Sequence, residues 1–448
     1  MNWLFVMLIP IAMIGHAILW ISFWNRLQAT GAPQWIIDAL EGIAFAMFAM
    51  IPVIIGWALL YPVAESLKVF GSVYLSAAAL LGVGMTTKAM LRRTARRTSA
   101  IRKQRAVVES YDALREQSLD VAGWKSRWLF RFPGNQSFEL EINEKEIELP
   151  RLDDRLDGLS IAHLSDLHFS GRIVRGFFEE AIEHVNEMDA DIVAITGDLV
   201  DYREYLSWIP PTLGRLRARH GVYVILGNHD CKQNLTQMRF LLNESGLISL
   251  SGRLHQIDVN GVRVVLAGNE LPWIAPTSDM SGCPTRDEVS QLRILLSHSP
   301  DQIEWARHFD FDLMLSGHTH GGQFRIPGIG PFICPSRLPL EYASGVLFDP
   351  PTVLHVTRGL SGLVPLRLNC RPELTRLVLR SPVTVKPEEQ VVTSVALPND
   401  IETKFKNDND GSFLNSRTVV SGAAWRSTYV ENEANPQSFD DLLVMDQA

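Results

Sequence analysis

The sequence predicts an α/β domain preceded by membrane-spanning α-helices. Three observations support this fold class: three long apolar runs within the first 87 residues, five short apolar runs between residues 159 and 322 that end in polar clusters, and a helical pattern between the first two of these short runs. With 448 residues, of which 46% are hydrophobic and 21% charged, the chain has an ordinary globular composition and enough length for more than one domain.

The three long runs, 3–24, 42–64 and 69–87, contain no Asp, Glu, Lys or Arg. Each holds about 19–23 residues, enough for a helix to cross the roughly 30 Å hydrocarbon core of a bilayer. The third run is rich in Gly, Ala and Ser, so a helix packed against the other two is an alternative. The first run lacks a basic n-region, which argues against a cleaved signal peptide. We expect a membrane region over residues 1–90 with about three transmembrane helices.

Basic residues follow the third run at once. Eight of them precede Glu109, the first acidic residue of this segment: Lys88, Arg92, Arg93, Arg96, Arg97, Arg102, Lys103 and Arg105. The positive-inside rule places this segment in the cytoplasm, and with three spans the N-terminus is outside. We expect a basic juxtamembrane helix and linker over residues 91–154. This stretch either contacts anionic lipid headgroups or serves only as a topology signal.

Residues 383–448 differ in composition from the rest of the chain. From residue 387 onward there are eleven acidic and four basic side chains, which account for most of the net charge of −8. Apolar periodicity is poor there, so we expect an acidic, disordered tail. The remainder is nearly neutral, and the expected catalytic core lacks a dense basic tract, which argues against nucleic acid as the main partner.

The four cysteines, Cys231, Cys283, Cys334 and Cys370, form no C-x-x-C pair. A zinc-ribbon site is therefore without support, and reduced thiols in a cytoplasmic domain are expected. An oxidised pair is the alternative.

The five short runs are typical of buried strands, because each has 4–7 residues rich in Ile, Val and Leu and closes on Gly or Ser. They read "LSIAHLSDLH", "DIVAITGDLVD", "VYVILGNHD", "LRILLSHSP" and "DLMLSGHTHGGQ". The helical pattern 174–188 between the first two indicates a βαβ unit and a shared sheet. Ligands of open α/β sheets bind at the carboxyl ends of the strands, so we expect the polar residues after each run to converge on one site.

These polar residues are of types that bind metals. The set comprises Asp166, His168, Asp198, Asn228, His298, His318 and His320. Oxygen and imidazole donors together suit Mn, Fe, Zn or Ni better than Ca or Mg, and the set is large enough for two ions that share one aspartate. Asn228 would be a neutral ligand, which keeps the site positive enough to hold a phosphate. His229 needs another role, because adjacent residues seldom point at one ion; its imidazole can donate a proton to a leaving oxygen.

Five motifs resemble the signature blocks of calcineurin-like metallophosphoesterases, in the family's order: "DLH" (166–168), "GDLVD" (197–201), "GNHD" (227–230), "SH" (297–298) and "GHTH" (317–320). The match covers residues 155–380, about half of the chain. "GLSIAHLSDLH" and "GHTHGGQFRIPGIGP" resemble the membrane-attached bacterial branch of this family. The resemblance implies an αββα sandwich of two mixed sheets flanked by helices, which we expect over residues 155–382.

The same resemblance implies the role of each residue. One metal would be bound by Asp166, His168, Asp198 and His320. The second would be bound by Asp198, Asn228, His298 and His318, with Asp198 bridging the two. His229 would be the catalytic proton donor.

Roles outside the ligand set are less specific. Asp201 and Asp230 would either orient ligating histidines or form turns, and Gln323 would line the pocket. Two features depart from the family's pattern: the segment "LAGNELPW" (266–273) has Asn269 and Glu270 where a more acidic loop is expected, and Cys231 stands where an aromatic residue is common. Both lie outside the ligand set, so they leave the substrate preference open.

Together these features predict a metal-dependent phosphoric ester hydrolase. The predicted reaction is hydrolysis of phosphodiester or pyrophosphate bonds by a membrane-anchored dinuclear enzyme, through a metal-bridging hydroxide. The predicted cofactors are two divalent metal ions (Mn, Fe, Zn or similar), with Mn favoured. The predicted location is the inner (cytoplasmic) membrane, multi-pass, with the catalytic domain on the cytoplasmic side.

Two alternatives accompany this prediction. The apolar stretch 324–335 favours a lipid-linked phosphoester, and the specific alternative is UDP-2,3-diacylglucosamine pyrophosphatase activity in lipid A synthesis. The alternative of another class is a membrane-anchored binding protein with a vestigial metal site, which the intact ligand set disfavours. The oligomeric state is left open.

Overall fold

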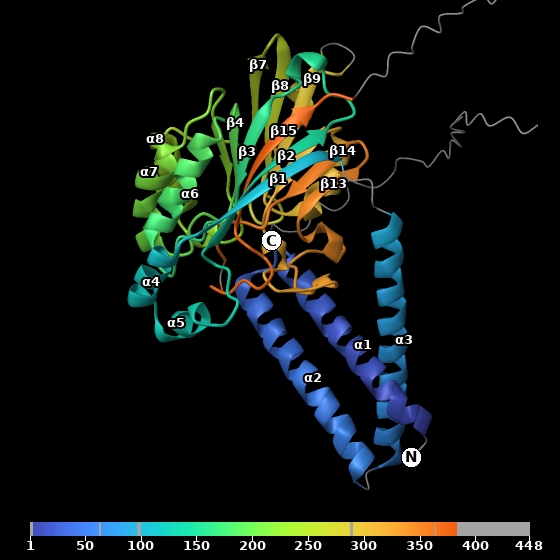
Figure 1. Cartoon of the computed structure of the whole chain (residues 1–448). Coiled ribbons are helices and arrows are strands. Elements are labelled where there is room, and N and C mark those ends of the chain that lie inside the picture. Colours follow the sequence, from blue (N-terminus) through green and yellow to red (C-terminus); the bar gives the residue numbers. More distant parts are fainter. Residues whose placement is uncertain (1–2, 62–63, 96–99, 287–289, 363, 383–448) are drawn as a thin grey trace, which may run out of the picture. The chain divides into compact units, whose positions relative to one another are not determined.

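The computed structural model describes residues 3–382 except 62–63, 96–99, 287–289 and 363. The acidic tail predicted for residues 383–448 lies outside the described residues. The chain begins with three long helices, α1 (Trp3–Gln28), α2 (Gln34–Leu60) and α3 (Glu65–Ala95), so most of each apolar run is helical (Figure 1). Two segments are long and apolar enough to cross a membrane, Trp35–Ala58 and Glu65–Lys88. Helices α1 and α3 pack closely, because Gly15 lies against the backbone of Ala78 and leaves no room for a Cβ atom.

The first of two large sheets has seven strands in the order β1–β2–β15–β3–β4–β5–β6. Their bounds are β1 (Ile101–Ser110), β2 (Glu139–Glu148), β3 (Ser160–Leu164), β4 (Ile192–Thr196), β5 (Val222–Ile225), β6 (Ile248–Ser249) and β15 (Glu373–Arg380). Strands β3 to β6 are parallel to one another. Strand β15 is antiparallel to β3 and parallel to β2, and β1 is antiparallel to β2. The sheet is therefore mixed.

The second sheet has six strands in the order β13–β14–β10–β9–β8–β7. Their bounds are β7 (Leu254–Val259), β8 (Val262–Asn269), β9 (Gln291–Ser297), β10 (Leu313–Ser316), β13 (Gly345–Asp349) and β14 (Thr352–Val356). The four central strands are parallel, and β7 and β13 are antiparallel at the two edges. A short hairpin, β11 (Arg325–Ile326) and β12 (Gly330–Pro331), lies outside both sheets.

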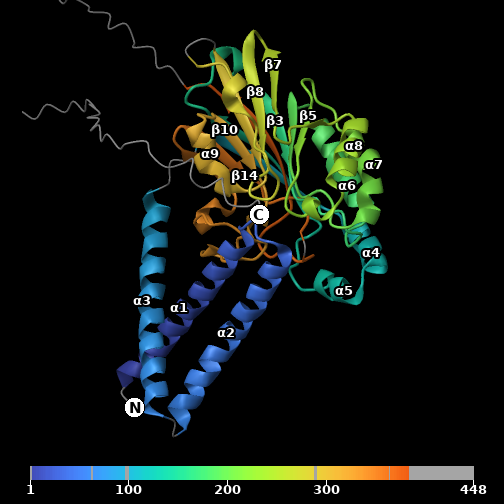
Figure 2. The same cartoon turned by 180° about the vertical axis from the view of Figure 1, so that it is seen from behind.

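The core lies between the two sheets and under helices on their outer faces (Figures 1 and 2). Between the sheets, Ile161, Ile192 and Ile294 from β3, β4 and β9 are fully buried. Helices α6 (Arg175–Glu187), α7 (Ile209–Thr212) and α8 (Leu235–Glu244) cover the first sheet, and α9 (Ile303–His308) covers the second. Helix α6 buries Phe178 and Ile182 on one face, as the 3.6-residue period requires. The order helix, sheet, sheet, helix confirms the predicted αββα fold class.

Residues 91–154 differ from the basic juxtamembrane helix and linker predicted for them. Helix α3 ends at Ala95, and the later residues form β1, α4 (Asp112–Val121), α5 (Trp124–Phe130) and β2. The prediction followed the charge of the segment, but β1 pairs with β2 along nearly its whole length and becomes an edge of the first sheet. Its exposed Arg102, Lys103 and Arg105 suit an edge strand, because charged side chains oppose pairing with another chain.

Candidate metal centre

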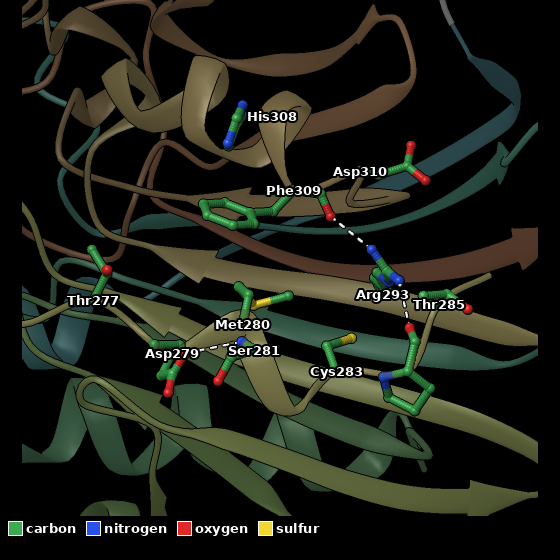
Figure 3. A pocket seen from close by; sticks show the side chains of 12 residues that line it. Thr277, Asp279, Met280, Ser281, Cys283, Thr285, Arg293, His308, Phe309 and Asp310 are labelled. Carbon is green, nitrogen blue, oxygen red and sulfur yellow. Dashed lines mark hydrogen bonds between the residues drawn. The ribbon is translucent and has the colours of Figure 1, made fainter. Parts of the chain in front are cut away.

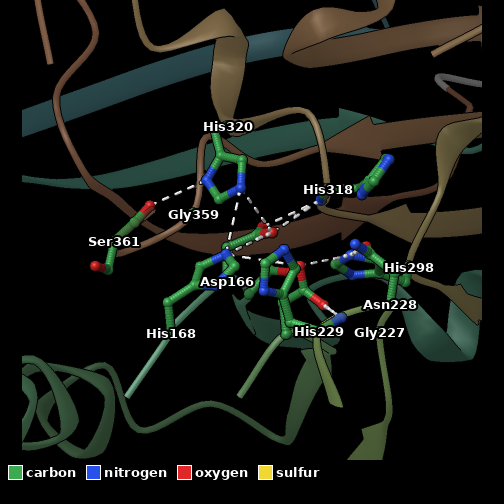
Figure 4. A network of polar contacts seen from close by, with 12 residues as sticks. Asp166, His168, Gly227, Asn228, His229, His298, His318, His320, Gly359 and Ser361 are labelled. Atoms are coloured by element: carbon green, nitrogen blue, oxygen red, sulfur yellow. Dashed lines mark hydrogen bonds and ion pairs between the residues drawn. The ribbon is translucent and has the colours of Figure 1, made fainter. Parts of the chain in front are cut away.

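All seven predicted ligands lie at one edge of the two sheets: Asp166, His168, Asp198, Asn228, His298, His318 and His320. The first four follow the carboxyl ends of the parallel strands β3, β4 and β5 in the first sheet. The other three follow the parallel strands β9 and β10 in the second sheet. The labelled ligands in Figure 4 point toward one another. Each sheet therefore contributes ligands to a single site.

The first ligand group comprises Asp166, His168, Asp198 and His320, whose ligand atoms lie within 4.8 Å of one another. His168 Nε2 lies 3.6 Å from Asp198 Oδ2, and His320 Nε2 lies 3.6 Å from Asp166 Oδ1. The two Nε2 atoms are 3.3 Å apart. Two imidazole nitrogens and two carboxylates that face one point fit a divalent metal with mixed nitrogen and oxygen ligands.

The second group comprises Asp198, His298 and His318. His298 Nε2 lies 3.2 Å from Asp198 Oδ2 and 3.2 Å from Asn228 Oδ1. His318 Nε2 is buried without a hydrogen-bond partner among the described residues, so a metal ion there would satisfy it. Asp198 belongs to both groups, which is the position that a bridging carboxylate requires.

Neighbouring acceptors fix the tautomers of three ligating histidines. His298 Nδ1 donates a hydrogen bond to the carbonyl oxygen of Thr196 at 2.6 Å, and His320 Nδ1 donates to that of Ser361 at 3.0 Å. Nδ1 of His168 lies 2.8 Å from a carboxylate oxygen of Asp201. Because each Nδ1 carries the hydrogen, each Nε2 is left with the lone pair that can bind a metal.

The backbone of the site is strained. Five ligands have positive φ angles: Asp166 (55°), His168 (47°), Asp198 (54°), His318 (67°) and His320 (51°). This conformation costs a non-glycine residue on the order of 1–3 kcal/mol and persists only where the surrounding structure imposes it. Two glycines allow the close packing, because Gly227 lies against the side chain of Asp198 and Gly359 against that of Asp166. Such strain concentrated on the ligands indicates a functional site.

The carboxylates dominate the electrostatics of the site. Burial alone would lower the pKa of His298, but Asp198 raises it to about 9. Burial likewise opposes a raised pKa of His168, yet Asp201 and Asp198 raise it to about 9. Burial lowers the pKa of His318 to about 3, and the charge of His298 acts in the same direction. The carboxylates therefore favour positive charge at His168 and His298, which a metal ion would supply.

Asp201 contacts a ligand and the predicted proton donor together. Its Oδ1 lies 2.8 Å from His168 Nδ1 and 3.0 Å from His229 Nδ1. Its Oδ2 accepts from Arg172 Nη1 at 3.1 Å, and Arg172 also donates to the Tyr202 hydroxyl at 2.9 Å. This geometry matches the orienting role considered for Asp201. Arg172 was missed at the sequence level, because it lies in a loop with no motif of its own.

The other two predicted supporting residues, Asp230 and Gln323, form hydrogen bonds with the backbone of loops. Asp230 Oδ1 accepts from the backbone N–H groups of Leu199 and Val200 at 2.9 and 3.0 Å, and its Oδ2 accepts from Gly227 N at 2.8 Å. It therefore joins the loops after β4 and β5 and contacts no ligating histidine directly. Gln323 Nε2 donates to the carbonyl oxygen of Val364 at 2.9 Å, in the loop beside His320.

Two residues of the "LAGNELPW" segment support the site. The ring of Trp273 has its centroid 4.8 Å from that of His318 and 5.6 Å from that of His298, so this indole lies against the second ligand group. Glu270 is buried and accepts hydrogen bonds from Leu226 N at 2.7 Å and Ser251 Oγ at 2.6 Å. It therefore supports the end of β5, immediately before Asn228.

A buried polar network lies between the two sheets behind the ligands. Lys145 Nζ in β2 is 2.6 Å from Glu373 Oε1 in β15 and 3.2 Å from His355 Nε2 in β14. His355 Nδ1 is 2.8 Å from His163 Nδ1 in β3, and His163 Nε2 is 2.9 Å from Thr196 Oγ1. His163 and His355 lie outside the five sequence motifs. The network ends at the threonine whose carbonyl oxygen orients a metal ligand.

A separate pocket of about 640 Å³ lies between residues 277–285 and 308–310 (Figure 3). Its Arg293 donates to the carbonyl oxygens of Phe309 at 2.9 Å and Pro284 at 2.8 Å, so the fold already uses this guanidinium. None of the metal-ligand groups found among the described residues lines it. The candidate functional site is therefore the cluster of predicted metal ligands and not this pocket.

Comparison with known proteins agrees with this geometry. The family profile described as calcineurin-like phosphoesterase matches residues 159–322. The chain is 30% identical over 256 residues to the "Uncharacterized metallophosphoesterase YkuE" of Bacillus subtilis (strain 168), which covers 54% of this chain and 86% of that protein. It is 31% identical over 232 residues to the "Phosphodiesterase YaeI" of Escherichia coli (strain K12), which covers 50% of this chain and 84% of that protein.

A vertebrate protein is also similar. The chain is 29% identical over 263 residues to the "Transmembrane protein with metallophosphoesterase domain" of Danio rerio, across 54% of this chain and 57% of that protein. This relative and the two apolar helices both point to membrane association.

Proposed function

Because the chain belongs to the calcineurin-like metallophosphoesterases, a family of metal-dependent phosphoester hydrolases, we propose that it hydrolyses phosphodiester or pyrophosphate bonds at a dinuclear metal centre. The observation that carries the proposal is the shared position of Asp198 in two ligand groups. We assign the two sites as the family resemblance implies: Asp166, His168, Asp198 and His320 for one metal, and Asp198, Asn228, His298 and His318 for the other.

Divalent metal ions bound there would supply Lewis acidity toward the phosphoryl oxygens and would activate the attacking water. The mixed donor set suits Mn, Fe or Zn, and Mn is our first choice. The chain's own contribution is to hold these donors in place, through the strained loops and the hydrogen bonds to the Nδ1 atoms described above.

We assign proton donation to His229. In the hydrolysis, the water oxygen forms a bond to phosphorus as the bond from phosphorus to the leaving oxygen breaks, and the leaving oxygen takes a proton from the imidazole. His229 Nδ1 lies 3.0 Å from Asp201, so the opposite nitrogen, Nε2, is the one available to the leaving group. The backbone N–H of His229 donates to Asp198 Oδ1 at 2.8 Å, which places the donor beside the shared carboxylate.

We further propose that residues 1–90 form a multi-pass anchor of about three spans in the inner (cytoplasmic) membrane. Two apolar helices and a relative named as a transmembrane protein support membrane association. The basic residues that follow α3 support a cytoplasmic catalytic domain. In this arrangement the phosphoesterase domain over residues 155–382 is completed by β1 and β2, which lie before residue 155 and extend its first sheet.

Two substrate classes are compatible with the site. The name of the Escherichia coli relative favours a phosphodiester. The apolar helices and the apolar stretch 324–335 favour a lipid-linked substrate, and UDP-2,3-diacylglucosamine is the specific candidate. A vestigial metal site in a binding protein would be free to lose ligands, whereas all seven predicted ligands lie at one edge of the sheets.

The test is hydrolysis by the full-length protein, purified in detergent and supplied with Mn, of bis-p-nitrophenyl phosphate and of UDP-2,3-diacylglucosamine. The full-length chain is used because β1 (Ile101–Ser110) is the edge strand of the first sheet, and a fragment that begins at residue 110 would lack it. Faster turnover of the lipid nucleotide would establish the pyrophosphatase alternative, and faster turnover of the simple diester would establish a general phosphodiesterase. Asp198→Ala is the negative control. If the wild-type protein contains bound metal but hydrolyses neither compound faster than Asp198→Ala does, the proposed function is wrong.

A further inference from the structure

The segment between β1 and β2 lies at the same edge as the metal centre. Strand β1 is antiparallel to β2, β2 is parallel to β15, and β15 is antiparallel to β3, so β1 and β3 run in the same direction. The carboxyl end of β1, where α4 and α5 begin, therefore lies at the edge where β3 ends and the ligands follow. The topology thus places the start of α4 at the sheet edge that contains the candidate metal centre.

Helix α5 presents two exposed indoles. Trp124 is 75% exposed and Trp128 is 64% exposed, and residues four apart lie on one face of a helix. Val121, just before the helix, is 65% exposed. The helix is held by its other face, because Phe130 is fully buried with its ring centroid 5.2 Å from that of Phe138. The outward side chains are therefore not required by the core, and they form an apolar surface in water.

The charged side chains of α5 and of the residues that follow it are basic. Residues 121–138 contain three basic side chains, Lys125, Arg127 and Arg131, and no acidic one. All three are exposed, and Lys125 Nζ lies 5.6 Å from the centre of the Trp124 ring. Tryptophans with neighbouring Lys and Arg are typical of segments that lie at the interface between water and an anionic bilayer.

Hydrogen bonds connect α5 to the loop whose Ser361 contacts the predicted metal ligand His320. Asn135 Nδ2 donates to the carbonyl oxygens of Leu129 in α5 and Pro365, each at 2.9 Å. Arg367, whose carbonyl oxygen accepts from Gln136 N at 2.9 Å, donates through its guanidinium to the carbonyl oxygen of Ser361. That same carbonyl oxygen accepts the hydrogen bond from His320 Nδ1. A chain of hydrogen bonds therefore links α5, which carries the exposed indoles, to the residues around the candidate metal centre.

The apolar N-terminal helices meet the same edge. Asn25, near the end of α1, accepts a hydrogen bond from Cys334 N at 2.9 Å and donates to the carbonyl oxygen of Phe332 at 3.3 Å. These residues follow the β11–β12 hairpin, where Ile326 is exposed. Strand β11 is joined to the site edge, because Arg325 N donates to the carbonyl oxygen of Leu368 at 3.0 Å. A membrane that holds α1 would thus lie next to this edge.

We propose that α5, with the exposed residues around it, docks on the surface of the anionic bilayer that holds the N-terminal helices. The metal centre then faces the interface between lipid and water, and a substrate reaches it by diffusion within the membrane. The docking rests on the membrane anchor proposed above, and this last consequence rests in addition on the proposed hydrolytic activity. The occupant is a bilayer because the surface combines exposed indoles, basic side chains on and after α5, and continuity with the end of an apolar helix.

The first test measures depth in the membrane without any use of activity. The full-length protein is placed in lipid nanodiscs of phosphatidylcholine and phosphatidylglycerol, with a fluorescent amino acid in place of Trp128. The matched control carries it in place of Phe240, which is 61% exposed on α8. We expect lipids with a nitroxide on the acyl chain to quench the label at position 128 at least threefold more than the label at position 240. Equal, weak quenching at both positions would overturn the docking.

The second test uses the double variant Trp124→Ser/Trp128→Ser. We expect its hydrolysis of a phosphodiester lipid in nanodiscs to fall at least fivefold, while hydrolysis of soluble bis-p-nitrophenyl phosphate stays unchanged. Equal activity of variant and wild type on the lipid would overturn the membrane route to the site. Absence of activity in the wild type on both compounds would instead contradict the proposed function, and the quenching result would still decide the docking.

Discussion

Replacement of Asp201 by Asn tests whether one carboxylate supports both metal binding and proton donation. Its Oδ1 accepts from two imidazoles, at 2.8 Å from His168 and 3.0 Å from His229, and its Oδ2 accepts from Arg172 at 3.1 Å. An amide has only one oxygen, so either the two imidazoles or the guanidinium would face an N–H₂ group. Neither orientation of Asn restores all three hydrogen bonds.

The expected magnitude follows from the type of contact. Loss of a carboxylate that orients a ligating histidine lowers metal affinity or activity by about 10–100-fold, which is about 1.4–2.7 kcal/mol. Asp201→Asn should therefore need about 10–100-fold more Mn for half-maximal activity. At saturating Mn, kcat should remain below the wild-type value, because His229 has also lost its partner.

The assay is a Mn titration of bis-p-nitrophenyl phosphate hydrolysis, with metal content measured on the same samples. Asp191→Asn is the matched control, because this carboxylate accepts from Ser160 N at 2.8 Å at the opposite end of the first sheet. The control should keep the wild-type Mn dependence. Unchanged Mn dependence and unchanged kcat in Asp201→Asn would refute the orienting role.

Three further predictions concern single positions. His229→Ala should lower kcat by about 10²–10⁴-fold for poor leaving groups with metal content retained, and loss of the metals instead would contradict its role as proton donor. Asp198→Ala should lose both ions by elemental analysis, and a full metal complement would exclude the bridging assignment. Glu373→Gln should destabilise the fold by about 3–5 kcal/mol in urea titrations, because the charge of Lys145 is left buried and unpaired. Burial opposes ionisation of Glu373, but Lys145 and Arg358 hold its pKa well below the ordinary value. The free energy of unfolding of the wild type should therefore fall as the pH drops below about 4.3. Glu373→Gln should lack this part of the pH dependence.

The central strands were predictable because their signal is local. Each of β3, β4, β5, β9 and β10 is a short buried run of aliphatic residues closed by a small residue, and each coincides with a predicted strand. The ligands follow these strands directly, so the topological rule for strand ends was enough to bring them to one site. The central strands and the predicted ligands were therefore both predictable from the same local pattern in the sequence.

The outer strands and the supporting residues depend on contacts between distant segments. Strand β2 pairs with β15, whose residues lie more than 200 positions later, and β1 is a strand because β2 offers it a partner. Similarly, Arg172 and Trp273 reach the site from loops, and nothing in their immediate sequence distinguishes them from surface or packing residues. Local periodicity and charge contain no information about such pairings.

The buried network of Lys145, Glu373, His355 and His163 also fixes how the two sheets are aligned. Apolar side chains between sheets tolerate small displacements, but the contacts of His355 in the second sheet with Lys145 and His163 in the first are satisfied in only one alignment. Since Asp198 comes from the first sheet and His298 and His318 come from the second, the arrangement of the proposed ligands depends on this alignment. A substitution in the network would therefore change the distances between proposed ligands without replacing any of them, and hydrolytic activity would be sensitive to the alignment of the sheets.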